Sequence, residues 1–439
     1  MNARRAIERT AAAGLLAAAL VAGDAAAVIR IEITQGVDGA QPIAAVPFMW
    51  YADGTAPFDV AAVVSADLAR SGRFRPIAPE AQPQAPADAA HPDFALWRTA
   101  GVDYLVVGRV LRDGDGYTIR FQLFDALKGG QVLGYSIPVA AADLRRGAHR
   151  AADMIYEKLT GQPGAFSTRI AFVTEVRDGG TRRYSLVVAD SDGENARAIV
   201  QSVEPLMSPS WSPDGKRLAY VSFESRLPQV FVQELGTGKR EVVSSRVGIN
   251  GAPAWSPDGT RLALTLSTSE GNPDLYVLEL KTGKLTRLTS SPAIDTEPYW
   301  FPDGQHIAFT SDRGGGPQVY VIDADGAGTR RLTFEGDWNA RAVVAPDGRS
   351  VVLVTREDGN FRIASLDLAS GVLRVLTDGR LDESPSFAPN SSMVLYATEY
   401  GGHGILAAVS ADGRVRQRLA LAEGDVREPA WSPYPPARD

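Results

Sequence analysis

Residues with the side chains of catalysis or metal binding are few in this sequence, and they lie far apart. The four histidines, His91, His149, His306 and His403, show none of the short spacings that bring metal ligands together. The run Asp-Gly-Asp-Gly at 113–116 resembles the start of a calcium loop, but it lacks the remaining ligands and the downstream Glu. We therefore expect a hairpin turn there, and we expect no metal and no cofactor.

A serine nucleophile would need a Gly-x-Ser-x-Gly elbow at a turn from a strand into a helix. The nearest match, Gly134-Tyr135-Ser136-Ile137-Pro138, lacks the second glycine and the change from strand to helix. No glycine-rich phosphate loop opens a helix either. The sequence therefore predicts a protein that is not an enzyme.

Composition narrows the class of protein and of partner. The chain has 439 residues, enough for two domains, and its 43 glycines and 28 prolines suit a turn-rich β protein. Its formal net charge is −7, and no basic run with interleaved aromatic residues occurs. We expect no nucleic-acid partner, which leaves a protein or a small molecule.

Residues 1–27 have the pattern of a secretory signal peptide. Arg4, Arg5 and Arg9 precede an apolar run at 11–22, and three alanines at 25–27 suit a signal peptidase. A buried N-terminal helix, the alternative, rarely has such flanks. No other apolar run is long enough to span a membrane, and the chain has no cysteine for a disulfide or a lipid anchor. We expect an exported protein that does not insert into the membrane.

An α/β domain is expected at 28–161, and it begins with an alternating segment at 28–34. There Ile29, Ile31 and Ile33 fall on one face of an extended strand. A terminal strand detaches easily and can add to the sheet of another protein. The alternative is an ordinary edge strand of its own domain.

The rest of this domain alternates strand and helix patterns, which predicts a small mixed sheet covered by helices. The expected elements are a strand at 42–48, a helix at 58–71, an irregular connection at 76–92, a short helix at 93–100, a hairpin of strands at 104–110 and 117–124, a third strand at 131–139 and a helix at 142–159. We expect a linker at 162–168.

Beyond the linker, one pattern returns at intervals of 43 to 45 residues, and it is most complete at 211–215 as Trp-Ser-Pro-Asp-Gly. An apolar anchor precedes each copy of the turn, at Trp211, Trp255, Trp300, Val344, Phe387 and Trp431. A repeat of this length suits one four-stranded propeller blade. Each unit must stack on its neighbours to bury both faces of its sheet.

The ends of the repeat array indicate a closed ring. The array starts at 169–174 with the second strand of a unit, and it ends at 428–433 with a lone first strand. Five full units and one unit split between the two ends make a six-bladed β-propeller at 169–439, in which the last strand closes the ring.

The exported N-terminus, the α/β domain and the six repeats together resemble the TolB family, the periplasmic components of the Tol-Pal system of Gram-negative bacteria. The resemblance covers essentially the whole mature chain. Beyond the repeated turn it is carried by Gly36-Val37-Asp38, Val46-Pro47-Phe48, Glu157-Lys158-Leu159-Thr160-Gly161, Pro205-Leu206-Met207-Ser208-Pro209, Asn250-Gly251-Ala252-Pro253, Thr296-Glu297-Pro298, Trp300-Phe301-Pro302-Asp303, Leu381-Asp382-Glu383 and Pro429-Ala430-Trp431-Ser432-Pro433-Tyr434.

The resemblance implies an adaptor with two protein partners and a role in outer-membrane integrity and cell division. It implies that the C-terminal domain of TolA binds the N-terminal strand by strand addition, at Val28, Ile29, Arg30, Ile31, Glu32, Ile33 and Thr34. It implies that the peptidoglycan-associated lipoprotein binds the mouth of the propeller, in the loops before each anchor. Those loops contain Met207, Asn250, Thr296, Glu297, Asn339, Arg341, Asp382, Glu383, Arg427 and Glu428. We expect a monomer.

Two alternatives remain open at this stage. Propellers with this turn also precede the hydrolase domain of prolyl oligopeptidase-like peptidases, and a propeller channel can bind a small ligand.

The repeats also depart from their own pattern at Val344-Ala345-Pro346 and at Pro389-Asn390-Ser391. Asn tolerates positive φ and a smaller anchor thins the core only locally, so the blade count stands. Ile249 is apolar where a binding loop is expected to be polar.

Overall fold

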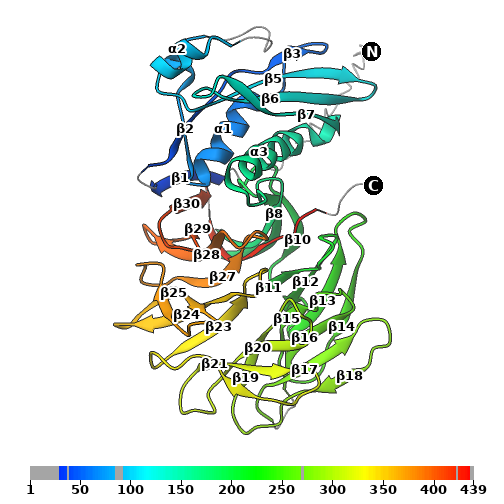
Figure 1. Ribbon diagram of the computed structural model, residues 1–439. Coiled ribbons are helices and arrows are strands. Elements are labelled where there is room, and N and C mark those ends of the chain that lie inside the picture. Colours follow the sequence, from blue (N-terminus) through cyan, green and yellow to red (C-terminus); the bar gives the residue numbers. More distant parts are fainter. Residues whose placement is uncertain (1–28, 37–38, 85–91, 268–270, 422–423, 436–439) are drawn as a thin grey trace, which may run out of the picture.

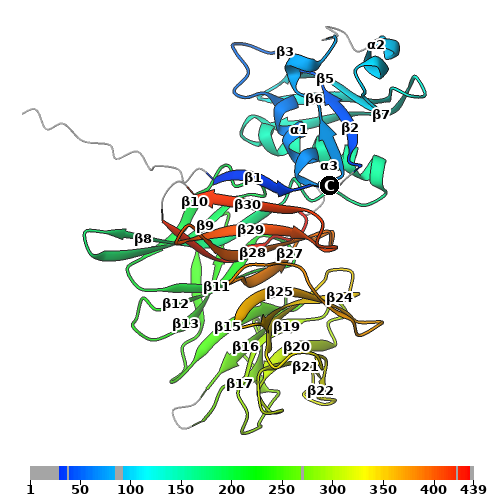
Figure 2. The ribbon, with the colours of Figure 1, turned by 90° about the vertical axis from the view of Figure 1, so that its left-hand side faces the viewer.

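The computed structural model describes residues 29–36, 39–84, 92–267, 271–421 and 424–435. The expected signal peptide and Val28 lie outside the described residues. An α/β domain lies against one side of a β-propeller, next to the blades that contain β8–β10 and β28–β30 (Figures 1 and 2).

The α/β domain has the expected mixed sheet. Its order is β4-β2-β5-β6-β7, with β3 also paired to β5; β2 is parallel to β4 and β5, whereas β5, β6 and β7 are antiparallel. The elements are β2 (Gln41–Ala45), β3 (Met49–Tyr51), α1 (Val60–Arg70), β4 (Phe74–Pro76), η1 (Pro79–Ala81), α2 (Phe94–Thr99), β5 (Tyr104–Asp113), β6 (Gly116–Asp125), β7 (Gly130–Ala140), η2 (Ala141–Asp143) and α3 (Leu144–Thr160).

Helices α1 and α3 pack on each other and on this sheet. A capping side chain marks the start of α1, and a glycine marks the end of α3. The carboxylate of Asp59 accepts a hydrogen bond from the backbone N–H of Ala61 at the start of α1. Gly161, with φ of 76°, ends α3 in the left-handed conformation that glycine adopts without strain. The expected hairpin at 113–116 joins β5 to β6, and Asp113 accepts a hydrogen bond from Thr118 there. The sequence missed β4, because it is three residues long and lies in a proline-rich stretch.

Six sheets form the propeller, as the repeats predicted. Five blades are consecutive in sequence. They consist of β11 (Leu206–Trp211), β12 (Arg217–Ser222), β13 (Gln229–Glu234) and β14 (Arg240–Ser244); β15 (Asn250–Trp255), β16 (Arg261–Leu266), β17 (Asp274–Glu279) and β18 (Leu285–Arg287); β19 (Asp295–Trp300), β20 (His306–Ser311), β21 (Gln318–Asp323) and β22 (Arg330–Arg331); β23 (Asn339–Val344), β24 (Ser350–Glu357), β25 (Asn360–Asp367) and β26 (Leu373–Val375); and β27 (Glu383–Phe387), β28 (Met393–Tyr400), β29 (His403–Ser410) and β30 (Arg416–Leu421).

The sixth blade is split between the two ends of the repeat array, and it closes the ring. It joins β8 (Arg169–Asp178), β9 (Thr181–Asp190) and β10 (Arg197–Ser202) to β31 (Asp425–Trp431). Strand β31 pairs with β8 from Asp425 opposite Glu175 to Trp431 opposite Ile170. This pairing removes the open edges that an unclosed array would expose.

The N-terminal strand β1 (Ile29–Gln35) does not pair with the sheet of its own domain. It adds a fifth strand to the blade of β27–β30, antiparallel to β30, with Ile29 opposite Leu421 (Figure 2). The interpretation of this segment as an edge strand of the α/β domain is therefore wrong, since alternation shows that a segment is extended but does not show which strand it pairs with.

Neighbouring blades are joined by the side chains of the repeated turn. The indole N–H of Trp255 donates to the carbonyl of Ser210 in the preceding blade at 3.1 Å. The guanidinium of Arg217 lies 4.5 Å from the centre of the Trp255 ring and donates to the carbonyl of Gly259 at 3.2 Å. The same stacking joins Arg169 to Trp211 and Arg261 to Trp300. The anchor tryptophans therefore stabilise the contacts between blades as well as the core.

Replacing Arg217 with alanine tests this contact. Arg217→Ala removes the stacked cation and one hydrogen bond across the blade boundary, so the free energy of unfolding should fall by about 1–2 kcal/mol. Urea-induced unfolding monitored by tryptophan fluorescence measures the change. Arg374→Ala, on the exposed face of an outer strand, is the matched control and should change stability by less than about 0.5 kcal/mol. Equal losses in both variants would contradict the role of Arg217.

Candidate partner-binding site

The first strands of neighbouring blades contact one another around the channel, and all begin at the same mouth. Each of them contains a register shift near its start, and each has one non-glycine residue with φ between 45° and 56° at that shift. These residues, which we call the mouth ring, are Ser208, Ala252, Glu297, Arg341, Ser384 and Glu428. Positive φ is costly outside glycine, so six equivalent occurrences show that the surrounding sheets impose this conformation.

Three members of the mouth ring are charged, and the structure brings them together. The guanidinium of Arg341 donates to the carboxylate of Glu428 and lies 4.0 Å from the carboxylate of Glu297. Burial lowers the pKa of Arg341, but the carboxylates of Glu428 and Glu297 outweigh this effect and raise the pKa above its ordinary value. Arg341 is therefore a fixed cation that links three separate blades at the mouth.

Four polar residues at the starts of the first strands are buried, so they shape the mouth loops from inside. They are Asn250, Asp295, Asn339 and Asp382. Asn250, for example, accepts hydrogen bonds from the hydroxyl of Ser244 at 2.6 Å and the N–H of Arg246 at 3.0 Å. Such buried side chains hold a loop in one conformation and are shielded from a partner at the surface. Asn250, Asn339 and Asp382 were expected to face a partner; the structure places them beneath that surface.

Asp295 belongs to the same set, although the sequence analysis did not single it out. Its carboxylate binds the guanidinium of Arg313 at 2.8 Å. The signal was present in the sequence, because Asp295 lies 45 residues after Asn250 and 44 before Asn339, at the spacing of the repeat.

A cavity of about 400 Å³ opens beside Arg341. Among the residues expected to bind the lipoprotein, Thr296, Glu297, Arg341 and Glu383 line it. Its apolar wall includes Ile294, Trp338, Phe361 and Leu381, and the rings of Trp338 and Phe361 meet edge to face with centres 5.0 Å apart. The mouth thus offers an apolar hollow that charged side chains also line, a common form of binding site for a protein side chain.

Exposed apolar side chains also occur at the starts of the first strands and in the loops that lead into them. These are Val203, Met207, Val247, Ile249, Ile294, Phe334 and Leu381, of which Phe334 is 76% exposed and Val247 72% exposed. Clusters of this kind mark surfaces for protein partners. Ile249, which looked out of place in a polar loop, is one of this set. Arg427 is exposed in the same region.

Within the described residues, the one group of histidine and carboxylate side chains close enough to hold a metal ion surrounds His149 and lies away from the mouth. His306 and His403 are at least partly exposed and lie near Asp303 and Asp425. His91 lies outside the described residues. His149 is buried, and residues far apart in sequence, Asp67 and Asp192, surround it.

Within the described ranges, no helix is both long and apolar enough to cross a membrane.

These features define a class of protein: an α/β domain joined to a six-bladed propeller with a charged and apolar mouth. The family described as "TolB beta propeller domain" matches residues 156–435, and the family described as "TolB amino-terminal domain" matches residues 29–132. The chain belongs to the TolB family.

Individual relatives agree with this assignment. The chain is 54% identical to the Tol-Pal system protein TolB of Xanthomonas campestris pv. campestris over 92% of this chain and 93% of the relative. It is 54% identical to the protein of the same name from Thioalkalivibrio sulfidiphilus, over 93% of this chain and 95% of the relative. The crystal structure of TolB from Acinetobacter baumannii is 42% identical, with a TM-score of 0.85 over 93% of this chain and all of that chain.

The ion pair at the mouth gives a test of the site geometry. Arg341→Met leaves the carboxylate of Glu428, whose side chain is 12% exposed, without its cation, so the free energy of unfolding should fall by about 3 kcal/mol. Adding Glu428→Gln removes the unpaired carboxylate charge and should restore most of the lost free energy of unfolding. Urea unfolding of the two single variants and the double variant measures the coupling. Additive losses would show that the two residues do not interact.

Proposed function

We propose that the protein is a non-enzymatic periplasmic adaptor of the Tol-Pal system that supports outer-membrane integrity and cell division. In this proposal the N-terminal strand binds the C-terminal domain of TolA, and the propeller mouth binds the peptidoglycan-associated lipoprotein. The mature chain consists of an α/β domain at 28–161, a linker at 162–168 and a propeller at 169–439, after removal of residues 1–27 on export. Membership of the TolB family is the observation that carries this proposal.

The way β1 is attached supports its role as a detachable strand. It is paired along its length with β30, but Ile31 is only partly buried against the blade core and Ile33 is 41% exposed. Thr34 adds one hydrogen bond to the carbonyl of Arg416 at 3.2 Å. Because Ile31 and Ile33 bury little apolar surface, backbone hydrogen bonds hold this part of the strand, and the edge of another sheet could supply the same bonds.

A truncation lacking residues 28–34 tests the role of the strand. It should lose measurable binding to the C-terminal domain of TolA, because the backbone groups for strand addition are gone, and it should bind the lipoprotein normally. Isothermal titration calorimetry with each purified partner measures both affinities. Undiminished binding of TolA by the truncated protein would overturn this part of the proposal.

The apolar surface of the mouth suggests a sharp test of the second partner. Leu381 and Val372 belong to the same blade region and are 43% and 58% exposed, but Val372 lies in the turn between β25 and β26, at the opposite end of the blade. Leu381→Arg should weaken lipoprotein binding at least tenfold, because a buried cation would replace an apolar contact. Val372→Arg is the matched control and should bind normally. Normal binding by Leu381→Arg would place the interface elsewhere.

The fold around Ser136 supports the non-enzymatic part of the proposal. Ser136 lies within the continuous strand β7, opposite Arg120, rather than at a turn into a helix. Its side chain is exposed on the sheet, so it has none of the features of a nucleophile elbow.

A further inference from the structure

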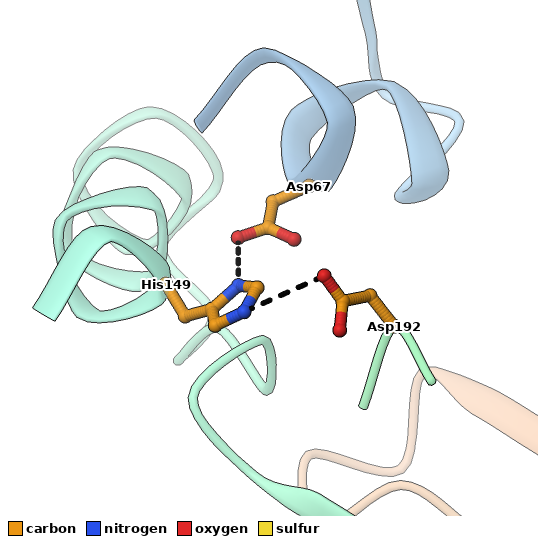
Figure 3. A group of neighbouring side chains, drawn as sticks. All are labelled: Asp67, His149 and Asp192. Atoms are coloured by element: carbon orange, nitrogen blue, oxygen red, sulfur yellow. Dashed lines mark hydrogen bonds and ion pairs between the residues drawn. The ribbon is translucent and has the colours of Figure 1, made fainter. Parts of the chain in front are cut away.

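A cluster of ionisable side chains lies buried where the α/β domain meets the propeller (Figure 3). Asp67 comes from α1, His149 from α3, and Asp192 from the loop between β9 and β10 of the propeller. The Nδ1 atom of His149 is 2.6 Å from Asp67 Oδ2, and its Nε2 atom is 3.5 Å from Asp192 Oδ2. The side chains of Asp67 and His149 are each 1% exposed and that of Asp192 is 12% exposed.

The neighbouring arginines show that this group is an ion-pair network rather than a metal site. Arg70 Nη2 lies 2.5 Å from Asp67 Oδ1, and Arg145 Nη2 lies 2.5 Å from Asp192 Oδ2. Two guanidinium cations thus already bind the carboxylates that a metal ion would need, and they would repel it.

The hydrogen-bond geometry indicates which ring atoms of His149 carry protons. The Asp67 carboxylate can only accept, so Nδ1 must donate to it. In a neutral ring the Nε2 lone pair would then face the Asp192 carboxylate, which also only accepts, and Nε2 has no other hydrogen-bond partner. A proton on Nε2 turns this repulsion into attraction. The geometry therefore favours the imidazolium.

The balance of charges around the ring also favours the imidazolium. Around His149 the charged groups are Asp67 and Arg70 from α1, Arg145 from α3, and Asp190 and Asp192 from the propeller. Asp153 of α3 also interacts with Asp67, so the carboxylates outnumber the two guanidinium groups, and a positive charge on the ring reduces this excess. Burial lowers the pKa of His149, but the carboxylates of Asp67 and Asp192 outweigh burial and raise the pKa above its ordinary value.

We propose that protonated His149 is an electrostatic latch that holds the α/β domain on the propeller. The latch spans the junction, because Asp67 and His149 belong to one domain and Asp192 belongs to the other. Arg70 strengthens it by donating to the carbonyl of Ser191 at 3.1 Å, and the carbonyl of Arg70 accepts a hydrogen bond from Gln417 of β30. Loss of the proton leaves two buried carboxylates facing a neutral ring, and the junction loosens.

The sign of the pH dependence follows from linkage. A histidine whose pKa is raised in the closed state contributes its full stabilisation below its ordinary pKa of about 6.5 and loses it as pH rises through the higher closed-state value. Within that window the equilibrium constant for opening should rise by up to about tenfold per pH unit. Asp153, buried nearby on α3, has a pKa raised to about 6 by burial and titrates in the same sense, so Asp153→Asn is the background in which to measure the effect.

The charge of His149 can be measured directly. The chain has four histidines, so a ¹³C-histidine NMR titration of the full mature protein resolves each ring, and His149→Gln assigns its signal. The latch requires a charged His149 ring at pH 7. A ring that is neutral at pH 7 would overturn the proposal.

The mechanical role needs a separate readout. The chain has no cysteine, so spin labels on Leu96→Cys in the α/β domain and Val372→Cys in the propeller report the distance between domains. His149→Gln should broaden this distance distribution at pH 6. The matched control is His403→Gln, the same change on a side chain that is 71% exposed, and it should leave the distribution narrow.

A second variant covers the case in which His149→Gln fails to fold. Asp192→Asn changes only the propeller side of the latch, and it should both lower the pKa of His149 and broaden the distance distribution. A narrow distribution in the folded His149→Gln or Asp192→Asn protein would show that the junction is held by other contacts, and the proposal would fail.

Discussion

The pairing of β31 with β8 is the constraint on which the rest of the structure depends. Four-stranded units cannot bury both of their faces alone, so the stability of every blade requires neighbours on both sides. The strand that ends at Trp431 completes the blade that begins at Arg169, and the N–H of Ser432 continues this pairing by donating to the carbonyl of Arg169 at 2.8 Å. Ring closure therefore joins segments at least 250 residues apart, and it fixes the mouth ring as a closed circle.

The two ends of the closed propeller differ in structure. At one end the Trp-Ser-Pro-Asp-Gly turns link the blades, and the turns at 388–393 and 410–415 lie at the cavity between the propeller and the α/β domain. At the other end the first strands begin, buried polar residues such as Asn250 shape the loops, and exposed apolar side chains surround the mouth. The α/β domain thus lies at the end of the propeller opposite the mouth.

The sequence predicted the fold well because the fold is repetitive. The same turn follows each anchor position, so the blades could still be counted although the repeat departs from its pattern at Val344 and at Asn390. The partner of β1 could not be predicted, because alternation at Ile29, Ile31 and Ile33 is the same whichever strand lies alongside.

The candidate site was predictable in outline but not in detail. Repeat spacing located the mouth loops, yet burial separates Asn250, Asn339 and Asp382 from Glu297 and Arg341, which lie two residues further along equivalent strands. That separation depends on the register shift and the positive φ of the mouth ring, which tertiary packing imposes. The cluster of Asp67, His149 and Asp192 was hidden for a similar reason, because it forms only when the two domains meet.

We propose a protein with a fixed binding mouth and a strand that leaves its own blade easily. Amide hydrogen exchange of the free mature protein tests this claim most directly, because exchange reports local opening residue by residue. The account predicts that the amides of β1 exchange at least a hundredfold faster than those of β28 in the same blade, while β31 is as protected as β28. Equal protection of β1 and β28 would show that β1 is a permanent part of the propeller and would contradict the account.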